Sequence, residues 1–409
     1  MSLGLLTSAV ESARRFDRVM GQRSGRRSIL VDARTPVNFT MVAPMFRALA
    51  ADARVNFCFT ASEEPERLRD IYREAPDNVR LMSTAAARLM RFDAYLASDF
   101  MWQPLPRGTC RIQMFHGVGG KYGFDAPTRS MRAWDRIFFV NERRLRNFIK
   151  AGVIDADSPA IRLIGYPKVD ALVNGTWSRR TVLESLKLDP AHPTVLYAPT
   201  WSPASSLNKL GAALLHRLRM MPVNVIVKLH DRSCDLRPQY SGGVDWPAAL
   251  QTHLAPGTAV LASTADICPY LVASDAMITD HSSAGFEYLL RDRPLVRIHV
   301  PELIALANIH QDYVRLLADV SESTTQVDDT VGAVERALAE PAAKSAMRQA
   351  VAADLFHQPG TATARCADAL YEAIALEPIS QRGGWDAVRR GGLVSSPSAL
   401  QPSCLRGDR

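Results

Sequence analysis

The sequence lacks several features that would indicate particular classes of protein. Its six cysteines never occur in a C-x-x-C spacing, which argues against a disulfide framework or a structural zinc site and favours a reducing cytoplasm. No window of about twenty apolar residues occurs, and the N-terminus has no long apolar core, so neither a transmembrane helix nor a signal peptide is predicted. Without an aromatic RNA-binding signature, a zinc-finger spacing or a fixed-period repeat, we expect no nucleic acid partner.

The chain is long and moderately basic. Its 409 residues exceed what one hydrophobic core usually serves, so we predict two domains. The net charge of +7 is distributed over arginine-rich patches, which suits an anionic membrane surface or a phosphorylated substrate. Residues 1–20 carry a basic amphipathic helical pattern. Such a helix either lies on an anionic membrane or docks on its own domain.

Apolar runs of strand length alternate with helical patterns, which indicates parallel, helix-covered sheets. The predicted strands are 28–33, 55–60, 79–82, 94–97, 111–115, 136–140, 161–164, 194–198, 223–229, 259–261, 276–279 and 295–299. The predicted helices include 42–51, 142–151, 180–186, 207–220, 284–291, 330–340 and 362–375. We therefore predict an α/β fold of two Rossmann-like doubly wound domains facing a cleft. The N-terminal, acceptor-side domain spans 1–180 and the C-terminal, nucleotide-donor domain spans 181–378, while the composition of 379–409 is typical of a disordered tail.

Four polar clusters directly follow predicted strands. They are His116-Gly117 with Lys121, then Pro199-Thr200-Trp201, then Lys228-Leu229-His230, and finally Asp280-His281-Ser282-Ser283. Ligands of open α/β sheets bind beyond the carboxyl ends of the strands, so these clusters are the candidate site. By contrast, Asp155-Ala156-Asp157 offers a D-x-D pattern but opens a turn at Ser158-Pro159, and no metal site is predicted there.

The chemistry of these residues suits a phosphate-bearing substrate. A neutral imidazole at His116 can take a proton from an attacking hydroxyl group. Lys228 and His230 can bind a diphosphate, and Ser282 and Ser283 can add hydroxyl groups and the free N–H groups of a helix start. Each residue also has a structural interpretation, as a helix cap, a hydrogen-bonding histidine or a solvated lysine. Four such clusters at strand ends, drawn from both halves of the chain, favour the functional interpretation.

At these clusters the sequence resembles the CDP-glycerol glycerophosphotransferase family, which includes teichoic-acid primases and polymerases and relatives in capsule synthesis. Further matches are Gly165-Tyr166-Pro167 with Asp170, and Asp292-Arg293-Pro294, so that the resemblance covers roughly residues 111–375. It implies a glycosyltransferase-B-like fold that needs no metal or other cofactor. It also implies transfer of glycerol phosphate from CDP-glycerol, or a related CDP-polyol, to a hydroxyl of a glycan or lipid-linked acceptor, with release of CMP. The expected location is the cytoplasm, with the inner face of the cell membrane as a candidate surface.

The resemblance also implies roles for individual residues. His116 and His230 are the expected catalytic residues; His116 resembles the general base, and the division of labour between the two histidines stays open. The expected donor-binding residues are Gly117, Lys121, Thr200, Lys228, Asp280, Ser282 and Ser283.

The sequence departs from the family pattern at several positions. His281 stands where an aromatic residue is usual, Ser202 where a basic residue is common, and Asp231-Arg232 where a proline is common. These departures leave the donor polyol open. A nucleotide-sugar transferase or a UDP-sugar 2-epimerase of the same fold is an alternative, although an epimerase favours carboxylates facing the sugar. A non-catalytic polymer-binding protein is a third interpretation. The modest size of the chain favours a primase over a large polymerase.

Overall fold

The computed structural model describes residues 25–122 and 129–378, which form two compact units. The first unit contains the described residues 25–116, 129–168 and 357–378, and the second contains 117–122 and 169–356. The predicted amphipathic helix at 1–20 and the predicted tail at 379–409 lie outside the described residues. In the described part of the chain, no helix is both long enough and apolar enough to cross a membrane.

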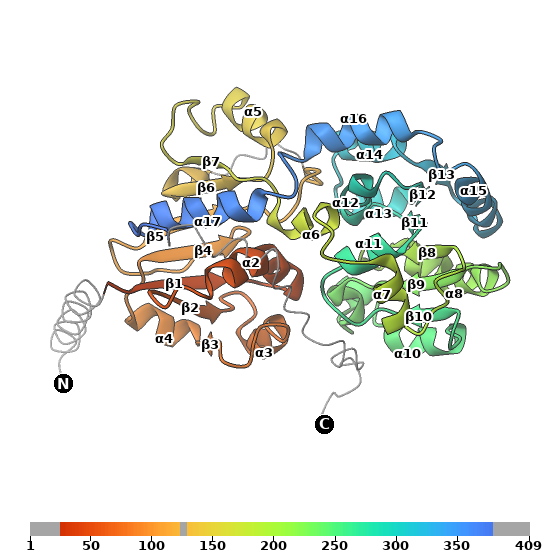
Figure 1. The fold of residues 1–409 in the computed structure, drawn as a ribbon, viewed down its shortest axis with the longest axis horizontal. Coiled ribbons are helices and arrows are strands. Elements are labelled where there is room, and N and C mark those ends of the chain that lie inside the picture. Colours follow the sequence, from red (N-terminus) through yellow and green to blue (C-terminus); the bar gives the residue numbers. More distant parts are fainter. Residues whose placement is uncertain (1–24, 123–128, 379–409) are drawn as a thin grey trace. The chain divides into compact units, whose positions relative to one another are not determined.

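Seven parallel strands form the sheet of the first unit, in the order β3-β2-β1-β4-β5-β6-β7 (Figure 1). They are β1 (Arg27–Asp32), β2 (Val55–Thr60), β3 (Arg80–Leu81), β4 (Ala94–Ser98), β5 (Cys110–Met114), β6 (Arg136–Phe139) and β7 (Ile161–Leu163). The helices of this unit are α2 (Pro36–Leu49), α3 (Leu68–Ile71), α4 (Thr84–Leu89), α5 (Glu142–Lys150) and α17 (Ala362–Ala373). The central strands are continuous apolar runs because a parallel sheet is covered on both faces.

Six parallel strands form the sheet of the second unit, in the order β10-β9-β8-β11-β12-β13. They are β8 (Thr194–Tyr197), β9 (Asn224–Val227), β10 (Ala259–Leu261), β11 (Ala276–Thr279), β12 (Leu295–Ile298) and β13 (Glu322–Thr324). The helices are α6 (Asp170–Val173), α7 (Arg179–Ser185), α8 (Ser206–Leu218), α9 (Pro238–Ser241), α10 (Trp246–Leu250), α11 (Cys268–Ala273), α12 (Ala284–Tyr288), α13 (Pro301–Leu306), α14 (Gln311–Asp319), α15 (Val327–Ala339) and α16 (Ser345–Leu355).

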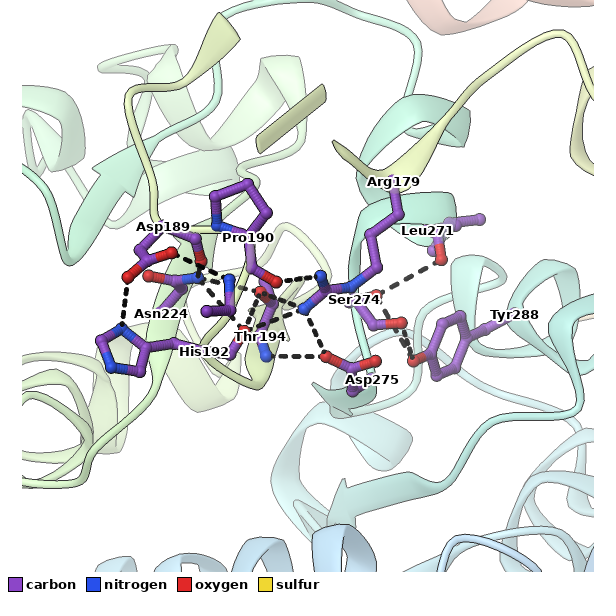
Figure 2. A network of polar contacts seen from close by, with 11 residues as sticks. Arg179, Asp189, Pro190, His192, Thr194, Asn224, Leu271, Ser274, Asp275 and Tyr288 are labelled. Carbon is purple, nitrogen blue, oxygen red and sulfur yellow. Dashed lines mark hydrogen bonds and ion pairs between the residues drawn. The ribbon is translucent and has the colours of Figure 1, made fainter. Parts of the chain in front are cut away.

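A hydrogen-bond network fixes the amino ends of this second sheet (Figure 2). Arg179 of α7 donates to the carboxylate of Asp275 (2.9 Å) and to the backbone carbonyls of Pro190 and His192. The same carboxylate accepts a hydrogen bond from the backbone N–H of Thr194 at the start of β8 (2.9 Å). The network holds the loop before β8 against the sheet, at the edge opposite to the predicted site residues.

The predicted α/β class with two parallel sheets is confirmed, and every predicted strand forms. The sequence analysis did not predict β13, because its residues are polar. A strand at the edge of a sheet is less buried and needs fewer apolar side chains. The helix predicted at 42–51 begins earlier in the structure than the sequence analysis expected. α2 starts at Pro36, because the side chains of Thr35 and Asn38 form a capping box that satisfies the free N–H groups of the first turn.

The chain divides between the units at Lys168 and Val169 rather than at the predicted residue 180. The short helix α6 packs on α11, and Arg291 of the second unit donates to the carbonyl of Leu172 (2.8 Å). The last described helix differs from the prediction as well. α17 returns to the first unit and packs beside α2 (Figure 1), where Tyr371 donates to the carboxylate of Asp52 (3.0 Å).

Candidate active site

Most predicted site residues lie along one edge of the second unit's sheet. Thr200 follows β8, Lys228 and His230 follow β9, and Ser282 and Ser283 follow β11. β9, β8 and β11 are adjacent parallel strands, so their carboxyl ends meet at this edge. The structure therefore brings three of the four sequence clusters together within one unit.

Asp280 organises this edge from inside. Its buried carboxylate accepts hydrogen bonds from the backbone N–H groups of Thr200 (2.8 Å), His281 (2.7 Å) and Ser206 (3.1 Å), and from the Ser206 hydroxyl (3.0 Å). Four donors match the acceptor capacity of two carboxylate oxygens. The sequence analysis counts Asp280 among the expected donor-binding residues. In the structure Asp280 is buried and joins the loop after β11 to the loop after β8.

The helix that follows Ser283 is shorter than predicted. α12 has five residues and continues as a 3-10 turn over Leu289–Arg291. A helix this short has a small dipole, so the free N–H groups of its first turn contribute less than expected. Ser282 and Ser283 are both part-exposed, and the Ser282 hydroxyl accepts only a long hydrogen bond from the N–H of Ala284 (3.4 Å). Their hydroxyl groups remain the main contribution of this loop to the edge.

Lys121 reaches the same edge from the 117–122 segment. Its Nζ donates to the hydroxyl of Thr200 (3.1 Å), and its carbonyl accepts from the N–H of His310 (2.9 Å). Burial lowers the pKa of Lys121 to about 8, against the opposing effect of the Asp280 carboxylate. The sequence places Lys121 in the N-terminal domain. By its contacts it belongs to the second unit instead.

A glycine lets the 117–122 segment lie close to α12 and α14. A Cβ atom added to Gly119 would lie 2.6 Å from the ring of Phe286 and 2.9 Å from that of Tyr313. Real Cβ atoms do not approach other atoms so closely, so only glycine fits there. A Cβ atom added to Gly117 would meet nothing within 4 Å. The backbone of this segment therefore packs closely against the unit at Gly119 and not at Gly117.

The ring of His230 is held through one of its nitrogens. Nδ1 lies 3.2 Å from the backbone nitrogen of Arg232 and 2.9 Å from Oδ1 of Asp231. The ring is part-exposed, so Nε2 is the nitrogen left to contact a ligand. Nearby, Lys228 is buried and its Nζ donates to the carbonyl of Leu229. The lysine therefore places positive charge below the edge rather than on its surface.

Arg232 also lies at this edge, after β9, and the sequence analysis did not single it out as functional. Its guanidinium lies over the rings of Trp201 (4.8 Å) and Tyr240 (4.6 Å), at cation–π distance from both. The centroid of the Trp201 ring is 6.2 Å from that of His230. A positive charge is thereby fixed beside His230.

His116 forms a histidine–carboxylate pair in the first unit. Its Nδ1 lies 3.5 Å from Oδ1 of Asp99, and Oδ2 of Asp99 is 2.7 Å from the Arg34 guanidinium. The hydroxyl of Tyr166 donates to the His116 carbonyl (2.9 Å). A carboxylate beside Nδ1 favours the proton on that nitrogen and leaves the lone pair on Nε2, which is the arrangement that a general base needs. With 42% of its side chain exposed, His116 is accessible to a substrate.

Asp99 was missed by the sequence interpretation. It follows β4 and has a positive φ of 135°, a conformation that non-glycine residues rarely adopt and that is concentrated at functional sites. Burial raises the pKa of its carboxyl group, but the charges of His116, Arg34 and Arg144 outweigh that effect and lower the pKa overall. Asp99 is therefore ionised at neutral pH. The next residues along the loop expose the aromatic side chains of Phe100 and Trp102.

Basic residues at the end of β12 extend the edge of the second unit. Arg297 is buried on the strand and His299 follows it. The ring of His281, after the neighbouring strand β11, is also buried and packs edge-on against His299, with centroids 5.9 Å apart. The sequence shows Arg297 and His299 only as part of a strand, so no pattern identified them.

Comparison with known proteins assigns the family. The sequence profile of the CDP-Glycerol:Poly(glycerophosphate) glycerophosphotransferase family matches residues 31–371. The chain belongs to this family. A teichoic acid poly(glycerol phosphate) polymerase of Staphylococcus epidermidis is 25% identical over 180 residues, a match that covers 41% of this chain and 23% of the polymerase. The match thus spans less than a quarter of that relative's length.

Solved structures support the fold of this glycerophosphotransferase family member. The wall teichoic acid polymerase TagF has a TM-score of 0.63 at 14% identity, and the match covers 91% of this chain and 95% of TagF. A putative UDP-N-acetylglucosamine 2-epimerase from Listeria monocytogenes has a TM-score of 0.53 at 13% identity, covering 85% and 96% of the two chains. Within the described residues, no cluster of three or more His, Cys, Asp or Glu side chains is placed to hold a metal ion.

Proposed function

We propose that this protein transfers glycerol phosphate, or a related polyol phosphate, from a CDP-activated donor to a hydroxyl group of a glycan or lipid-linked acceptor. One observation carries the proposal, namely that one sheet edge gathers Lys121, Thr200, His230, Ser282 and Ser283. The buried carboxylate of Asp280 beneath them already accepts four hydrogen bonds from the protein. Amine, imidazole and hydroxyl groups suit a diphosphate. Phosphoryl transfer depends mainly on alignment and on neutralising charge, which such groups supply.

In the proposed reaction, His116 acts as the general base. Its Nε2 accepts the proton of the acceptor hydroxyl, and the acceptor oxygen bonds to the phosphorus that carries the polyol. The bond from that phosphorus to the oxygen of CMP breaks, and CMP leaves with the bridging oxygen. Asp99 holds the imidazole and stabilises the imidazolium that forms. The exposed rings of Phe100 and Trp102, next to Asp99, suit the apolar face of an acceptor sugar.

The roles of the two histidines then differ. His116 has a carboxylate partner, Asp99, and is the one predicted catalytic or donor-binding residue in the first unit. His230 lies instead on the sheet edge of the second unit, beside Arg232 and Trp201. We therefore assign His230 to binding the donor's phosphates through Nε2. This assignment predicts different kinetic defects for the two alanine variants.

The proposed function is tested by incubating the purified full chain with CDP-glycerol, CDP-ribitol and UDP-sugars and measuring CMP or UDP release with glycan acceptors. We expect acceptor-dependent CMP release from a CDP-polyol. His116→Ala is expected to lower turnover with little change in CDP affinity, and His230→Ala to weaken CDP binding. His216→Ala, at an exposed position on α8, serves as the matched control and should behave as wild type.

Two outcomes would refute the proposal. Release of UDP but not CMP would favour the nucleotide-sugar alternatives. Wild-type turnover in His116→Ala would remove the assigned base.

The cellular setting is also a proposal. A CDP-activated donor and a cell-surface product, a teichoic acid or a capsule polymer, place the protein in the cytoplasm at the inner face of the membrane. The net charge of +7 suits an anionic membrane surface. We further propose that transfer needs no metal ion, since basic side chains neutralise the diphosphate. Turnover that persists in excess EDTA is the expected result, and loss of turnover restored by Mg²⁺ is the contrary one.

A further inference from the structure

Arg297 carries a buried positive charge without a counter-charge. Arg297 is 4% exposed. Its guanidinium donates to the Ser323 hydroxyl (2.7 Å) and contacts Nδ1 of His299 (3.3 Å). The Nε–H of Arg297 has no hydrogen-bond partner, and among the described residues no carboxylate lies within ion-pair distance of its guanidinium. A buried charge without a partner lowers the stability of the folded protein. Arg297 is thus suited to an anion that the chain itself does not supply.

The contact with Arg297 sets the tautomer of His299. A guanidinium can only donate hydrogen bonds, so Nδ1 of His299 must accept one and its proton, in the neutral ring, is on Nε2. Burial and the Arg297 charge lower the pKa of His299, which keeps the ring neutral at pH 7. His299 is part-exposed, unlike its two neighbours. It therefore gives the cluster an N–H donor that a ligand can reach.

His281 completes the cluster. Its side chain is fully buried, yet neither ring nitrogen has a hydrogen-bond partner. Burial lowers its pKa to about 3, and the positive groups Arg297 and Lys121 contribute to this shift. Buried polar atoms in native proteins are almost always paired, so two orphan nitrogens beside an unpaired guanidinium need an explanation. A ligand group at this place would provide it.

We propose that Arg297 and His299, supported by His281, bind a phosphate group of the nucleoside-diphosphate donor. This rests on the proposed function, because the cluster lies where that donor is expected. His281 directly precedes Ser282 in the chain, and Lys121 contributes to the electrostatic environment of His281. β11 and β12 are adjacent, so the cluster continues the same sheet edge by one strand. The bound phosphate supplies the counter-charge that Arg297 lacks and accepts from the N–H of His299.

A single substitution separates this role from a structural one, because it acts in opposite directions on stability and on binding. Arg297→Met removes the unpaired charge while filling the same space. We expect it to raise the thermal midpoint of the unliganded protein and to weaken CDP binding at least tenfold, measured by calorimetry on the full chain. His299→Ala should weaken binding by several-fold. Arg293→Met, an exposed arginine just before β12, removes the same charge and should leave CDP affinity unchanged.

The outcomes are distinct. If Arg297→Met binds CDP like wild type, the proposed phosphate contact is wrong, whatever happens to its stability, and the proposed function is untouched. If that variant does not fold, Arg297→Gln replaces the guanidinium with an uncharged amide that can still donate to the Ser323 hydroxyl. A folded Gln variant with wild-type CDP affinity would equally overturn the contact. Inorganic pyrophosphate is the second probe: if wild type releases no CMP from any donor yet binds pyrophosphate in an Arg297-dependent way, the proposed function fails and the anion site stands.

Discussion

The titration of Lys121 gives the sharpest test of the donor-side edge. Folding lowers its pKa from 10.5 to about 8, mainly because the amine is buried. Each pKa unit corresponds to about 1.4 kcal/mol, so keeping Lys121 charged in the unliganded protein costs about 3 kcal/mol. A bound diphosphate would return much of that energy by pairing with the ammonium. Binding of CDP above pH 8 should therefore take up a proton.

The sign of the pH dependence follows from this. Below pH 8 Lys121 is charged in both the free and the bound protein, and CDP affinity should not depend on it. Above pH 8 the free protein loses the proton while the complex keeps it, so the dissociation constant for CDP should rise about tenfold per pH unit. In the same range the unfolded chain keeps the proton up to its pKa of 10.5, so the unliganded protein should gain stability as the pH rises from 8 to 10.5.

Isothermal titration calorimetry in two buffers of different ionisation enthalpy measures the proton uptake directly. We expect about one proton per CDP at pH 9 for wild type, and none for Lys121→Met. Lys121→Arg is the matched control: its guanidinium stays charged throughout, so it should bind CDP without the alkaline loss. An alkaline loss of the same slope in Lys121→Met would refute the reasoning, because another group would then be titrating.

Three further changes test other parts of the structure. Asp99→Asn leaves the proposed base without its carboxylate, so turnover should fall about 10²-fold while CDP affinity stays constant; a parallel loss of both would contradict the assigned role. Because folding lowers the pKa of Asp99, its stabilising contribution should be present above pH 3.8 and be lost as the pH falls through the folded value, as acid unfolding of the variant and wild type can show. Gly119→Ala forces a Cβ to within 2.6 Å of a ring and should cost about 1–3 kcal/mol in urea unfolding as well as CDP affinity, whereas Gly117→Ala should do neither. Arg348→Met should lower the free energy of unfolding by about 3 kcal/mol, because this buried side chain donates to the Asp292 carboxylate and to three backbone carbonyls; a change below 1 kcal/mol (roughly the value of an exposed ion pair) would contradict its structural role.

The sequence predicted the strands well and the partners of site residues poorly. Apolar runs identify buried parallel strands, and polar clusters at their ends identified Thr200, His230 and Ser282 as candidates. Strand order is not encoded in such local patterns. Asp99 lies beside His116 only because β4 pairs with β5, and no sequence spacing links the two residues.

The sequence analysis also did not identify candidate site residues that lie inside predicted strands. Arg297 appears in the sequence as one polar residue in an otherwise apolar run, and its lack of a carboxylate partner is visible only in three dimensions. The surroundings of Asp280 were likewise not visible in the sequence. A carboxylate among basic and hydroxyl residues suggests a site residue, whereas its four donors come from backbone and side-chain groups that only folding brings near it.

The return of α17 to the first unit bears on how the protein is made. A ribosome releases the whole of residues 169–356 before it releases α17, so the second unit can fold while the chain is still being synthesised. The first unit is completed later, because α17 supplies Tyr371 to Asp52, and Ile374, the residue after α17, supplies its carbonyl to Arg27. Until then α2 lacks a neighbour for part of its surface. The unit encoded first is thus the unit completed last, and the surface of α2 is where a nascent chain would need protection from misassociation.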